Sequence, residues 1–186
     1  QIKYKNKIYE FKVSLVGKIQ IKNILMAMLA AEKSGLNFNQ IVNVIHRIKP
    51  VSGRLEKIGT IKNNSSVILD YAHTPDALKY TLKSIKEQFS HSSISIVFGC
   101  GGDRDKDKRP TMGKIANQYC NKIFLTDDNP RYENPKKIRN QIKKKIVRSK
   151  LVEIASRKKA IKVSIENLNS GDILLVAGKG HEIYQE

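Results

Sequence analysis

The sequence of 186 residues lacks tryptophan and contains only two cysteines, Cys100 and Cys120. Two cysteines cannot form the disulfide framework of a small secreted domain, and their scarcity indicates a reducing cytosol. Long apolar runs are also missing, whereas a membrane-spanning helix needs about 20 apolar residues. The N-terminal segment QIKYKNKIYEFKV alternates charged and apolar residues, which is not the pattern of a signal peptide. We therefore expect a cytoplasmic protein with no membrane insertion.

Acidic residues are scarce, because 17 Asp and Glu stand against 35 Lys and Arg, for a net charge of +18. A basic surface attracts nucleic-acid phosphates, so a nucleic-acid-binding domain is one alternative function. The basic residues are 27 Lys and only 8 Arg, however, and Lys shares A/T-rich codons with the abundant Ile and Asn. Proteins that read nucleic acids favour Arg for its bidentate geometry. We interpret the charge mainly as a lysine-coated surface.

Two common kinds of site are absent from the sequence. The Gly178-Lys179-Gly180 segment lacks the spacing and the terminal Ser or Thr of a phosphate-binding P-loop, and no other segment has them. Cys100 has no metal-ligating partner at a suitable spacing, so no metal site is predicted in this chain.

The first 50 residues differ in pattern from the remainder. Residues Lys3–Val13 alternate as a strand pair with a turn at Lys5-Asn6-Lys7, and two amphipathic helices are predicted over Lys18–Lys33 and Asn39–Ile48. Pro50 ends the second helix, and Val51-Ser52-Gly53 has the composition of a linker. We expect one region over residues 1–50 and a second domain over residues 51–186.

Short apolar runs alternate with longer amphipathic segments in the second region, which predicts an α/β, Rossmann-like, mostly parallel sheet flanked by helices. The expected strands are Val67–Leu69, Ile94–Phe98, Ile123–Leu125, Val152–Ile154 and Ile173–Val176. One expected helix begins near Pro75. The other three cover Pro110–Cys120, Pro135–Val147 and Arg157–Asn167.

Polar residues cluster directly after four of these strands. The segments are DYAHTP from Asp70, GCGGDRD from Gly99, TDDNPR from Thr126 and AGKGHE from Ala177. Because parallel strands end at the same edge of a sheet, and open α/β sheets bind ligands there, the four loops predict one binding rim.

Each loop suggests its own chemistry. His73 precedes a helix N-terminus, where it can donate a hydrogen bond to phosphate. Arg131 can grip a carboxylate with two parallel hydrogen bonds, while Asp128 can accept from an ammonium group. This combination suits the paired charges of an amino acid. The alternative for these loops is ordinary turn and helix-cap structure, with a solvated charge run at Asp103–Arg109.

Together the four loops resemble the C-terminal domain of the Mur ligases, in particular the members that add meso-diaminopimelate. The matching blocks are DYAHTPDAL, FGCGGDRDKDKRPTMG, TDDNPR and AGKGHEIYQ. Upstream, GKIQIKNILMA and VSGRLE are similar to the end of the family's central ATP-binding domain and to its hinge. Gln20 and Asp107 depart from residues that are common in this group.

The resemblance implies a role for each matched residue. The residues implied in ATP binding are Asn23, Arg54, Asp70 and His73. Those implied in binding meso-diaminopimelate are Arg104, Asp128, Asn129, Pro130, Arg131, Gly178 and Glu182. His181 is a candidate acceptor for the proton of the attacking amine, although a nearby carboxylate is an alternative.

The implied reaction is ATP-dependent formation of an amide bond through an acyl phosphate, with Mg²⁺ as cofactor. It joins the D-glutamate side chain of UDP-N-acetylmuramoyl-L-alanyl-D-glutamate to meso-diaminopimelate in bacterial peptidoglycan synthesis. A lysine-adding Mur ligase is the nearest alternative, but the Asp-Asn-Pro-Arg segment argues against it, because lysine lacks the carboxylate that Arg131 suits. We expect a monomeric fragment that is inactive alone, because the P-loop and the UDP-binding domain are missing.

Overall fold

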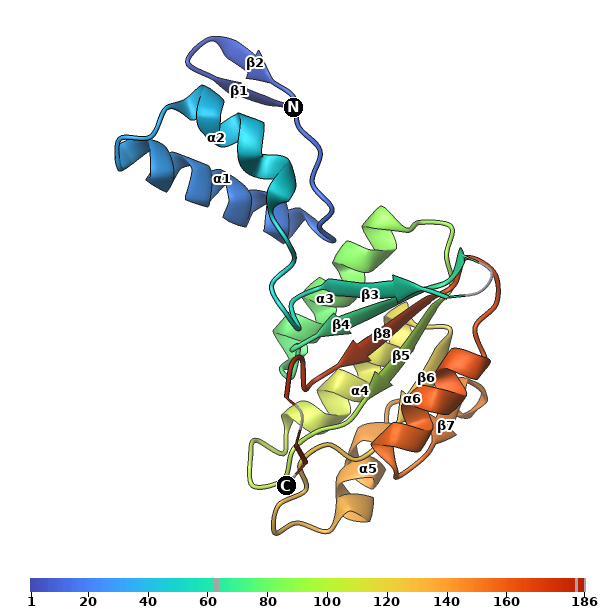
Figure 1. Cartoon of the computed structure of the whole chain (residues 1–186). Coiled ribbons are helices and arrows are strands. Elements are labelled where there is room, and N and C mark those ends of the chain that lie inside the picture. The colour runs from blue at the N-terminus through green and yellow to red at the C-terminus, as the bar shows by residue number, and fades with distance from the viewer. Residues whose placement is uncertain (62–63, 183, 186) are drawn as a thin grey trace.

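The computed structural model describes residues 1–61, 64–182 and 184–185. Its N-terminal part is a small hairpin packed on two helices (Figure 1). Strands β1 (Ile2–Tyr4) and β2 (Lys7–Tyr9) are joined by Lys5 and Asn6, both with positive φ, as a tight hairpin turn requires. Helices α1 (Lys18–Lys33) and α2 (Phe38–Val44) follow, and a 3-10 turn over Ile45–Arg47 extends the second.

A six-stranded sheet forms the larger part. Its strands are β3 (Glu56–Thr60), β4 (Ser66–Asp70), β5 (Ile94–Phe98), β6 (Lys122–Leu125), β7 (Leu151–Glu153) and β8 (Ile173–Ala177). They lie in the order β3-β4-β8-β5-β6-β7, with β3 antiparallel to β4 and the other neighbours parallel. The insertion of β8 between β4 and β5 brings the loop after β8 beside the loops that follow both neighbours.

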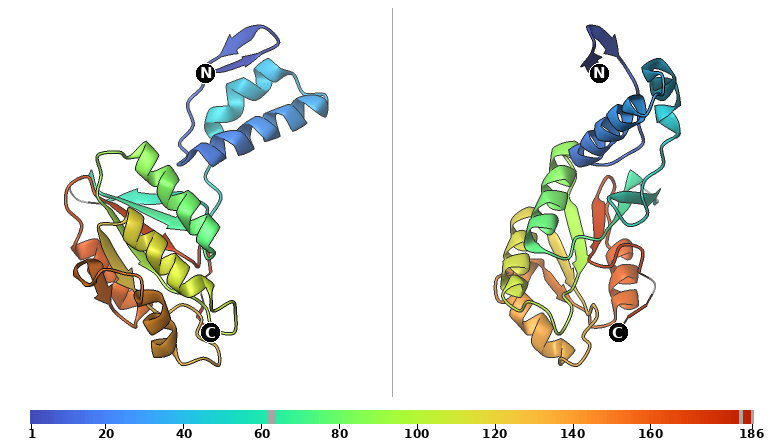
Figure 2. Two further views of the ribbon diagram at one scale, coloured as in Figure 1. Left: turned by 180° about the vertical axis from the view of Figure 1, so that it is seen from behind. Right: turned by 90° about the vertical axis from the view of Figure 1, so that its left-hand side faces the viewer.

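Helices cover both faces of this sheet (Figure 2). Helices α3 (Pro75–Gln88), α4 (Lys108–Tyr119) and α5 (Pro135–Lys143) lie on one face, while α6 (Arg157–Glu166) lies on the other. Thr74, Asn134 and Ser156 cap three of these helices with their side chains. Thr74 and Asn134 end the rim loops after β4 and β6, so local sequence sets where these two loops stop.

A separate apolar cluster fills each space between packed layers. Ile68, Ile96 and Leu175 of the sheet pack with Leu82 and Met112 on the three-helix face. A second cluster joins the opposite face of the sheet to α6, and a third lies between the hairpin and the first two helices. Among the described residues, no helix is long and apolar enough to cross a bilayer.

The sequence-based expectation of a mostly parallel sheet between helices is confirmed. The first helix has the expected bounds, and the other helices differ by a few residues at their ends. Strand β3 was not expected, because its residues EKIGT lie at the antiparallel edge and four of the five are exposed. The division into residues 1–50 and 51–186 stays a prediction, and Ile183 and Glu186 lie outside the described residues.

Candidate functional site

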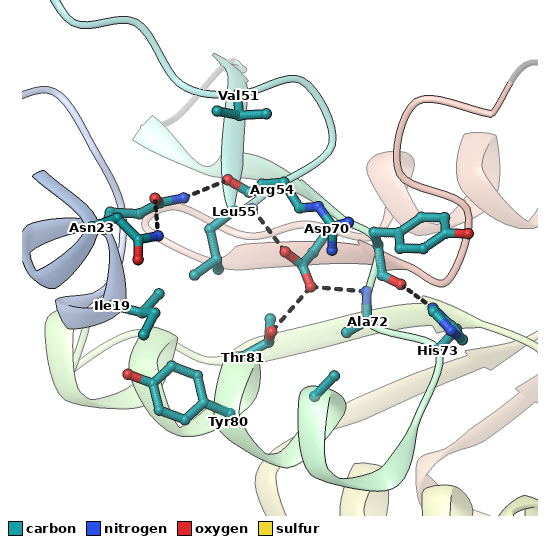
Figure 3. A pocket seen from close by; sticks show the side chains of 13 residues that line it. Ile19, Asn23, Val51, Arg54, Leu55, Asp70, Ala72, His73, Tyr80 and Thr81 are labelled. Carbon is teal, nitrogen blue, oxygen red and sulfur yellow. Dashed lines mark hydrogen bonds between the residues drawn. The ribbon is translucent and has the colours of Figure 1, made fainter. Parts of the chain in front are cut away.

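A cleft of about 450 Å³ lies where α1, the linker and the start of α3 meet (Figure 3). Asn23 lies at one end of it and His73 at the other, with Arg54, Leu55 and Asp70 between them. The wall also carries apolar and aromatic side chains, namely Ile19, Val51, Ala72, Ala77 and Tyr80. The four residues expected to bind ATP therefore line one cleft, although they come from three separate segments.

The Asp70 carboxylate holds this cleft together. Asp70 ends β4 and is buried, and its oxygens accept hydrogen bonds from Leu55 N at 2.8 Å, Ala72 N at 3.0 Å and Thr81 Oγ1 at 3.0 Å. These contacts tie the linker and helix α3 to the strand end. A buried carboxylate with three donors is satisfied by the protein itself, so its local role is to fix the backbone around the cleft.

Arg54 and His73 both contact Tyr71. The guanidinium of Arg54 lies 4.7 Å from the centre of the Tyr71 ring, and the His73 ring meets it edge-on at 4.7 Å. His73 Nδ1 is 2.9 Å from the Tyr71 carbonyl oxygen, which orients the ring at the N-terminus of α3. Gln20 Nε2 donates to the Arg54 carbonyl at 3.0 Å, and Asn23 donates to the Gln20 side chain at 3.4 Å.

A second group of expected residues meets further along the rim, where the loop after β6 touches the loop after β8. Asn129 is buried, and its Oδ1 accepts from Lys179 Nζ at 2.7 Å, while its Nδ2 lies 3.5 Å from Glu182 Oε2. Lys179 Nζ also lies 3.5 Å from Glu182 Oε2. Tyr71 donates to the other oxygen of Glu182 at 3.2 Å, which connects this group to the cleft.

Asp128 lies beside Gly178 and the buried Arg157. Its Oδ1 accepts from the Asn129 amide at 2.8 Å, and its Oδ2 is 3.8 Å from Arg157 Nη1. A Cβ added to Gly178 would lie 3.1 Å from that Oδ2, and the φ of this glycine is +108°. Glycine therefore allows the carboxylate to approach the loop after β8.

Arg131 faces the glycine-rich loop after β5. Its Nη1 donates to the Gly102 carbonyl at 2.9 Å, and the Gly102 amide donates to the Asn129 carbonyl at 2.8 Å. A Cβ on Gly102 would lie 1.9 Å from the Pro130 carbonyl oxygen, so no other residue fits this approach. The Gly-x-Gly-Gly segment thus lets two loops pack backbone to backbone beneath the Arg131 side chain.

An ion pair fastens the same two loops. Arg109 is completely buried, and its two terminal nitrogens donate to Glu133 at 2.8 and 2.9 Å. Arg109 also donates to the Gly101 carbonyl at 3.0 Å, and Glu133 accepts from the Asp103 amide at 2.7 Å. The hydrogen bonds from Arg109 lower the pKa of Glu133 to about 2, so the carboxylate is charged at neutral pH.

Three expected residues differ from the others in their surroundings. Arg104 is exposed and forms no hydrogen bond or ion pair with the described residues, so it is not joined to the Asp128–Arg131 group. His181 is exposed, and its ring stacks on Tyr71 at 6.3 Å between centres. Pro130 contributes its carbonyl, which accepts from the Glu133 amide at 3.0 Å.

The described residues contain no group of three or more His, Cys, Asp or Glu side chains placed to hold a metal ion. Cys100, in the rim loop after β5, is buried against Met112, and burial raises the pKa of its thiol to about 12. That thiol is therefore not a nucleophile.

A family model described as "Mur ligase, glutamate ligase domain" matches residues 53–180. The chain belongs to the Mur ligase family. The match covers the six-stranded sheet, three of the rim loops and the fourth as far as Gly180, and it confirms the family expected from the sequence blocks.

Relatives within the Mur ligases are similar along the whole chain. The UDP-N-acetylmuramoyl-L-alanyl-D-glutamate–2,6-diaminopimelate ligase of Rickettsia felis is 45% identical over 98% of this chain and 34% of its own length. The ligase of the same name from Chelativorans sp. is 42% identical over 100% of this chain and 38% of its own length. The chain thus spans about a third of the length of these relatives.

Solved structures of a Mur ligase and of a folylpolyglutamate synthase share the fold. A UDP-N-acetylmuramoyl-L-alanyl-D-glutamate–2,6-diaminopimelate ligase superposes with a TM-score of 0.71 at 40% identity, over 94% of this chain and 36% of its own. A folylpolyglutamate synthase of Mycobacterium tuberculosis, solved with ADP and AMPPCP, superposes with a TM-score of 0.72 at 16% identity. It covers 91% of this chain and 40% of its own, and at that identity the likeness shows the fold alone.

The sequence did not predict the residues whose contacts hold the rim loops of this Mur ligase domain in place. They are Tyr71, Arg109, Glu133, Arg157 and Lys179. Arg109 and Lys179 lay inside recognised blocks, but a basic residue in a lysine-rich sequence carries no sign of burial. Arg157 carried one signal, because an Arg in the first turn of a helix opposes the helix dipole.

Proposed function

We propose that the chain supplies the nucleotide-facing hinge and the amino-acid-binding domain of a cytoplasmic, monomeric UDP-N-acetylmuramoyl-L-alanyl-D-glutamate–diaminopimelate ligase. The observation that carries this proposal is the meeting of the Asp128–Arg131 loop with Gly178 and Glu182. The identity of 40 to 45% with proteins of that name supports the same function.

The amino acid would bind between these two loops. Asp128 and Glu182 present carboxylates that can accept from an ammonium group, and Arg131 presents a guanidinium that can pair with a carboxylate. Diaminopimelate carries one more carboxylate and ammonium pair than a simple amino acid, and the alternating acidic and basic groups along the rim match that pattern. Lysine would leave Arg131 without its carboxylate partner.

ATP would bind in the cleft of Figure 3. The apolar wall near Asn23 suits a flat base, and Arg54 and His73 lie toward the N-terminus of α3, where phosphate charge is favoured. Asp70, whose carboxylate is engaged by three protein donors, shapes this cleft instead of touching phosphate.

In this reaction ATP activates the D-glutamate carboxylate, and the diaminopimelate amine then displaces phosphate to form the amide. The residues of this chain orient the amine and neutralise phosphate charge, while the rest of the enzyme supplies the UDP-linked substrate. The described residues of this chain offer no carboxylate cluster that would hold Mg²⁺. His181 stays a candidate proton acceptor, in keeping with its exposed position beside Tyr71.

The direct test uses the full-length ligase that contains this chain. Phosphate release is measured with ATP and UDP-N-acetylmuramoyl-L-alanyl-D-glutamate, with either meso-diaminopimelate or L-lysine added. We expect release that depends on diaminopimelate, with a kcat/KM at least about 100-fold higher than for lysine, as a lost charge pair of roughly 3 kcal/mol implies.

Two results would contradict the proposal. Preferential use of lysine would place the protein among lysine-adding ligases. Absence of ligase activity together with salt-dependent binding of duplex DNA would favour the nucleic-acid alternative, which the charge of +18 first suggested.

A further inference from the structure

Arg157 is a buried arginine that uses only part of its hydrogen-bonding capacity. It occupies the first turn of α6, is 8% exposed, and donates from Nη2 to the Ala177 carbonyl at 2.9 Å. Its Nη1 is buried and has no hydrogen-bond partner among the described residues. Buried polar groups are almost always satisfied, so an open donor at a binding rim calls for a functional explanation.

The open nitrogen faces the site. Nη1 lies 3.8 Å from Asp128 Oδ2, which is too long for a hydrogen bond but within the range of an ion pair. The other oxygen of Asp128 accepts from the Asn129 amide, and Gly178 borders the carboxylate. Arg157 therefore places a positive charge next to the Asp128 carboxylate, from the face of the sheet that α6 covers.

The position of Arg157 is costly for helix α6. The first turn of this helix holds Arg157, Lys158 and Lys159 and contains no acidic residue. Cations at a helix N-terminus oppose the helix dipole, so helix stability alone does not favour them. Burial lowers the pKa of Arg157, whereas the carboxylates of Asp128 and Glu182 raise it, and arginine remains charged throughout.

Arg139 shows how a structural arginine differs. It is 9% exposed, and its guanidinium is used in ion pairs with Asp127 and with Glu153, the latter at 2.8 Å from Nε. Asp127 directly precedes Asp128, so the two arginines lie behind neighbouring residues of the same loop. Arg139 is consequently a control matched for burial and charge, on the opposite face of the sheet.

We propose that Arg157 is a positioning residue that holds the Asp128 carboxylate toward the ammonium group of the amino-acid substrate. This inference rests on the proposed function, because it assigns Asp128 to the amino-acid site. This positioning role is distinct from a role in folding. The hydrogen bond to the Ala177 carbonyl anchors the Arg157 side chain, and the nitrogen without a hydrogen-bond partner acts on Asp128.

The test measures KM for meso-diaminopimelate and for ATP in the full-length ligase with Arg157→Gln, Arg157→Lys and Arg139→Gln. We expect Arg157→Gln to raise KM for diaminopimelate at least tenfold and to leave KM for ATP within twofold. Arg157→Lys should recover most of the loss, because it keeps the charge. Arg139→Gln should lower the thermal midpoint without changing the ratio of the two KM values.

A double-mutant cycle with Asp128→Asn completes the experiment. If Arg157 acts through Asp128, adding Arg157→Gln to Asp128→Asn changes diaminopimelate affinity by less than twofold. Additive losses, equal rises in both KM values, or a fall in thermal midpoint alone would each overturn the inference. If Arg157→Gln fails to fold, the uncharged Arg157→Met variant, whose apolar chain fills a similar volume, takes its place in the same cycle with the same expected outcomes.

The outcome also separates this inference from the proposed function. If the wild-type enzyme prefers lysine, the proposed substrate is wrong, and the same KM ratio measured with lysine supports or overturns the role of Arg157. If the wild-type enzyme uses no amino acid, both proposals are overturned.

Discussion

Lys179 Nζ lies 2.7 Å from Asn129 Oδ1, and both residues are buried. This bond joins the loop after β8 to the loop after β6, although strand β5 separates the two strands in the sheet. Lys179, whose surroundings lack the P-loop pattern, therefore joins the two loops that we propose bind the amino acid.

Replacement of Lys179 by Met should loosen this site. The change leaves the Asn129 amide oxygen and the Tyr184 carbonyl without their shared donor, which costs roughly 2 kcal/mol for a charged hydrogen bond. Urea denaturation should report that loss, and KM for diaminopimelate should rise while KM for ATP stays constant. The exposed lysine variant Lys162→Met is the control, and equal effects from both variants would contradict the role given to Lys179.

Arg131→Ala tests the source of substrate choice. If the guanidinium grips the carboxylate that lysine lacks, the variant should lose about 100-fold in kcat/KM for diaminopimelate, equivalent to roughly 3 kcal/mol. Its activity with lysine should change by less than threefold, so the preference for diaminopimelate over lysine becomes smaller. A parallel loss with both amino acids would show that Arg131 only supports the loop through its bond to Gly102.

Glu133→Gln should destabilise the protein at neutral pH. It removes the carboxylate from a completely buried Arg109, and breaking a buried pair on one side costs about 3 kcal/mol. The measurement is the free energy of unfolding in urea. An exposed acidic residue, changed as Glu166→Gln, should alter stability by less than about 0.5 kcal/mol.

The same pair predicts how stability depends on pH. The pKa of Glu133 falls from 4.5 to about 2 on folding, so its contribution is complete above pH 4.5 and is lost as the pH falls toward 2. Urea denaturation between pH 2 and pH 6 should show this loss in the wild type, and the Glu133→Gln variant should show a flatter profile over that window. Identical profiles would place the acid-sensitive group elsewhere.

Gly102→Ala should disrupt the rim, because its Cβ would meet the Pro130 carbonyl oxygen at 1.9 Å. A backbone carbonyl cannot move aside as the end of a flexible side chain can. We therefore expect the free energy of unfolding to fall by about 2 kcal/mol or more. Gly59→Ala on β3 is the control, since a Cβ there meets nothing within 4 Å. Thermal unfolding of the two variants should differ clearly, and similar midpoints would refute the close approach.

The sequence allowed the layers and the ligand-bearing edge to be predicted, because apolar runs and helix caps are local signals. Strand β3 was not predicted because its exposed residues lack an apolar pattern. The Asp128–Arg131 loop could be proposed as a binding loop from its own residues, whereas the residues that support it could not be predicted. Arg109 and Glu133 are 24 residues apart, and Lys179 and Asn129 are 50 apart, so only the folded chain shows that they pair.

Tyr71 lies between the proposed nucleotide cleft and the proposed amino-acid site, with the Arg54 guanidinium over its ring and Glu182 accepting from its hydroxyl. A nucleotide that moved Arg54 would alter how firmly the phenol holds Glu182, and an amino acid that engaged Glu182 would act on Arg54 in return. Such an effect is reciprocal by thermodynamic necessity. If both regions bind the ligands we propose, this one aromatic ring would make the affinity for each ligand depend on the other by the same factor.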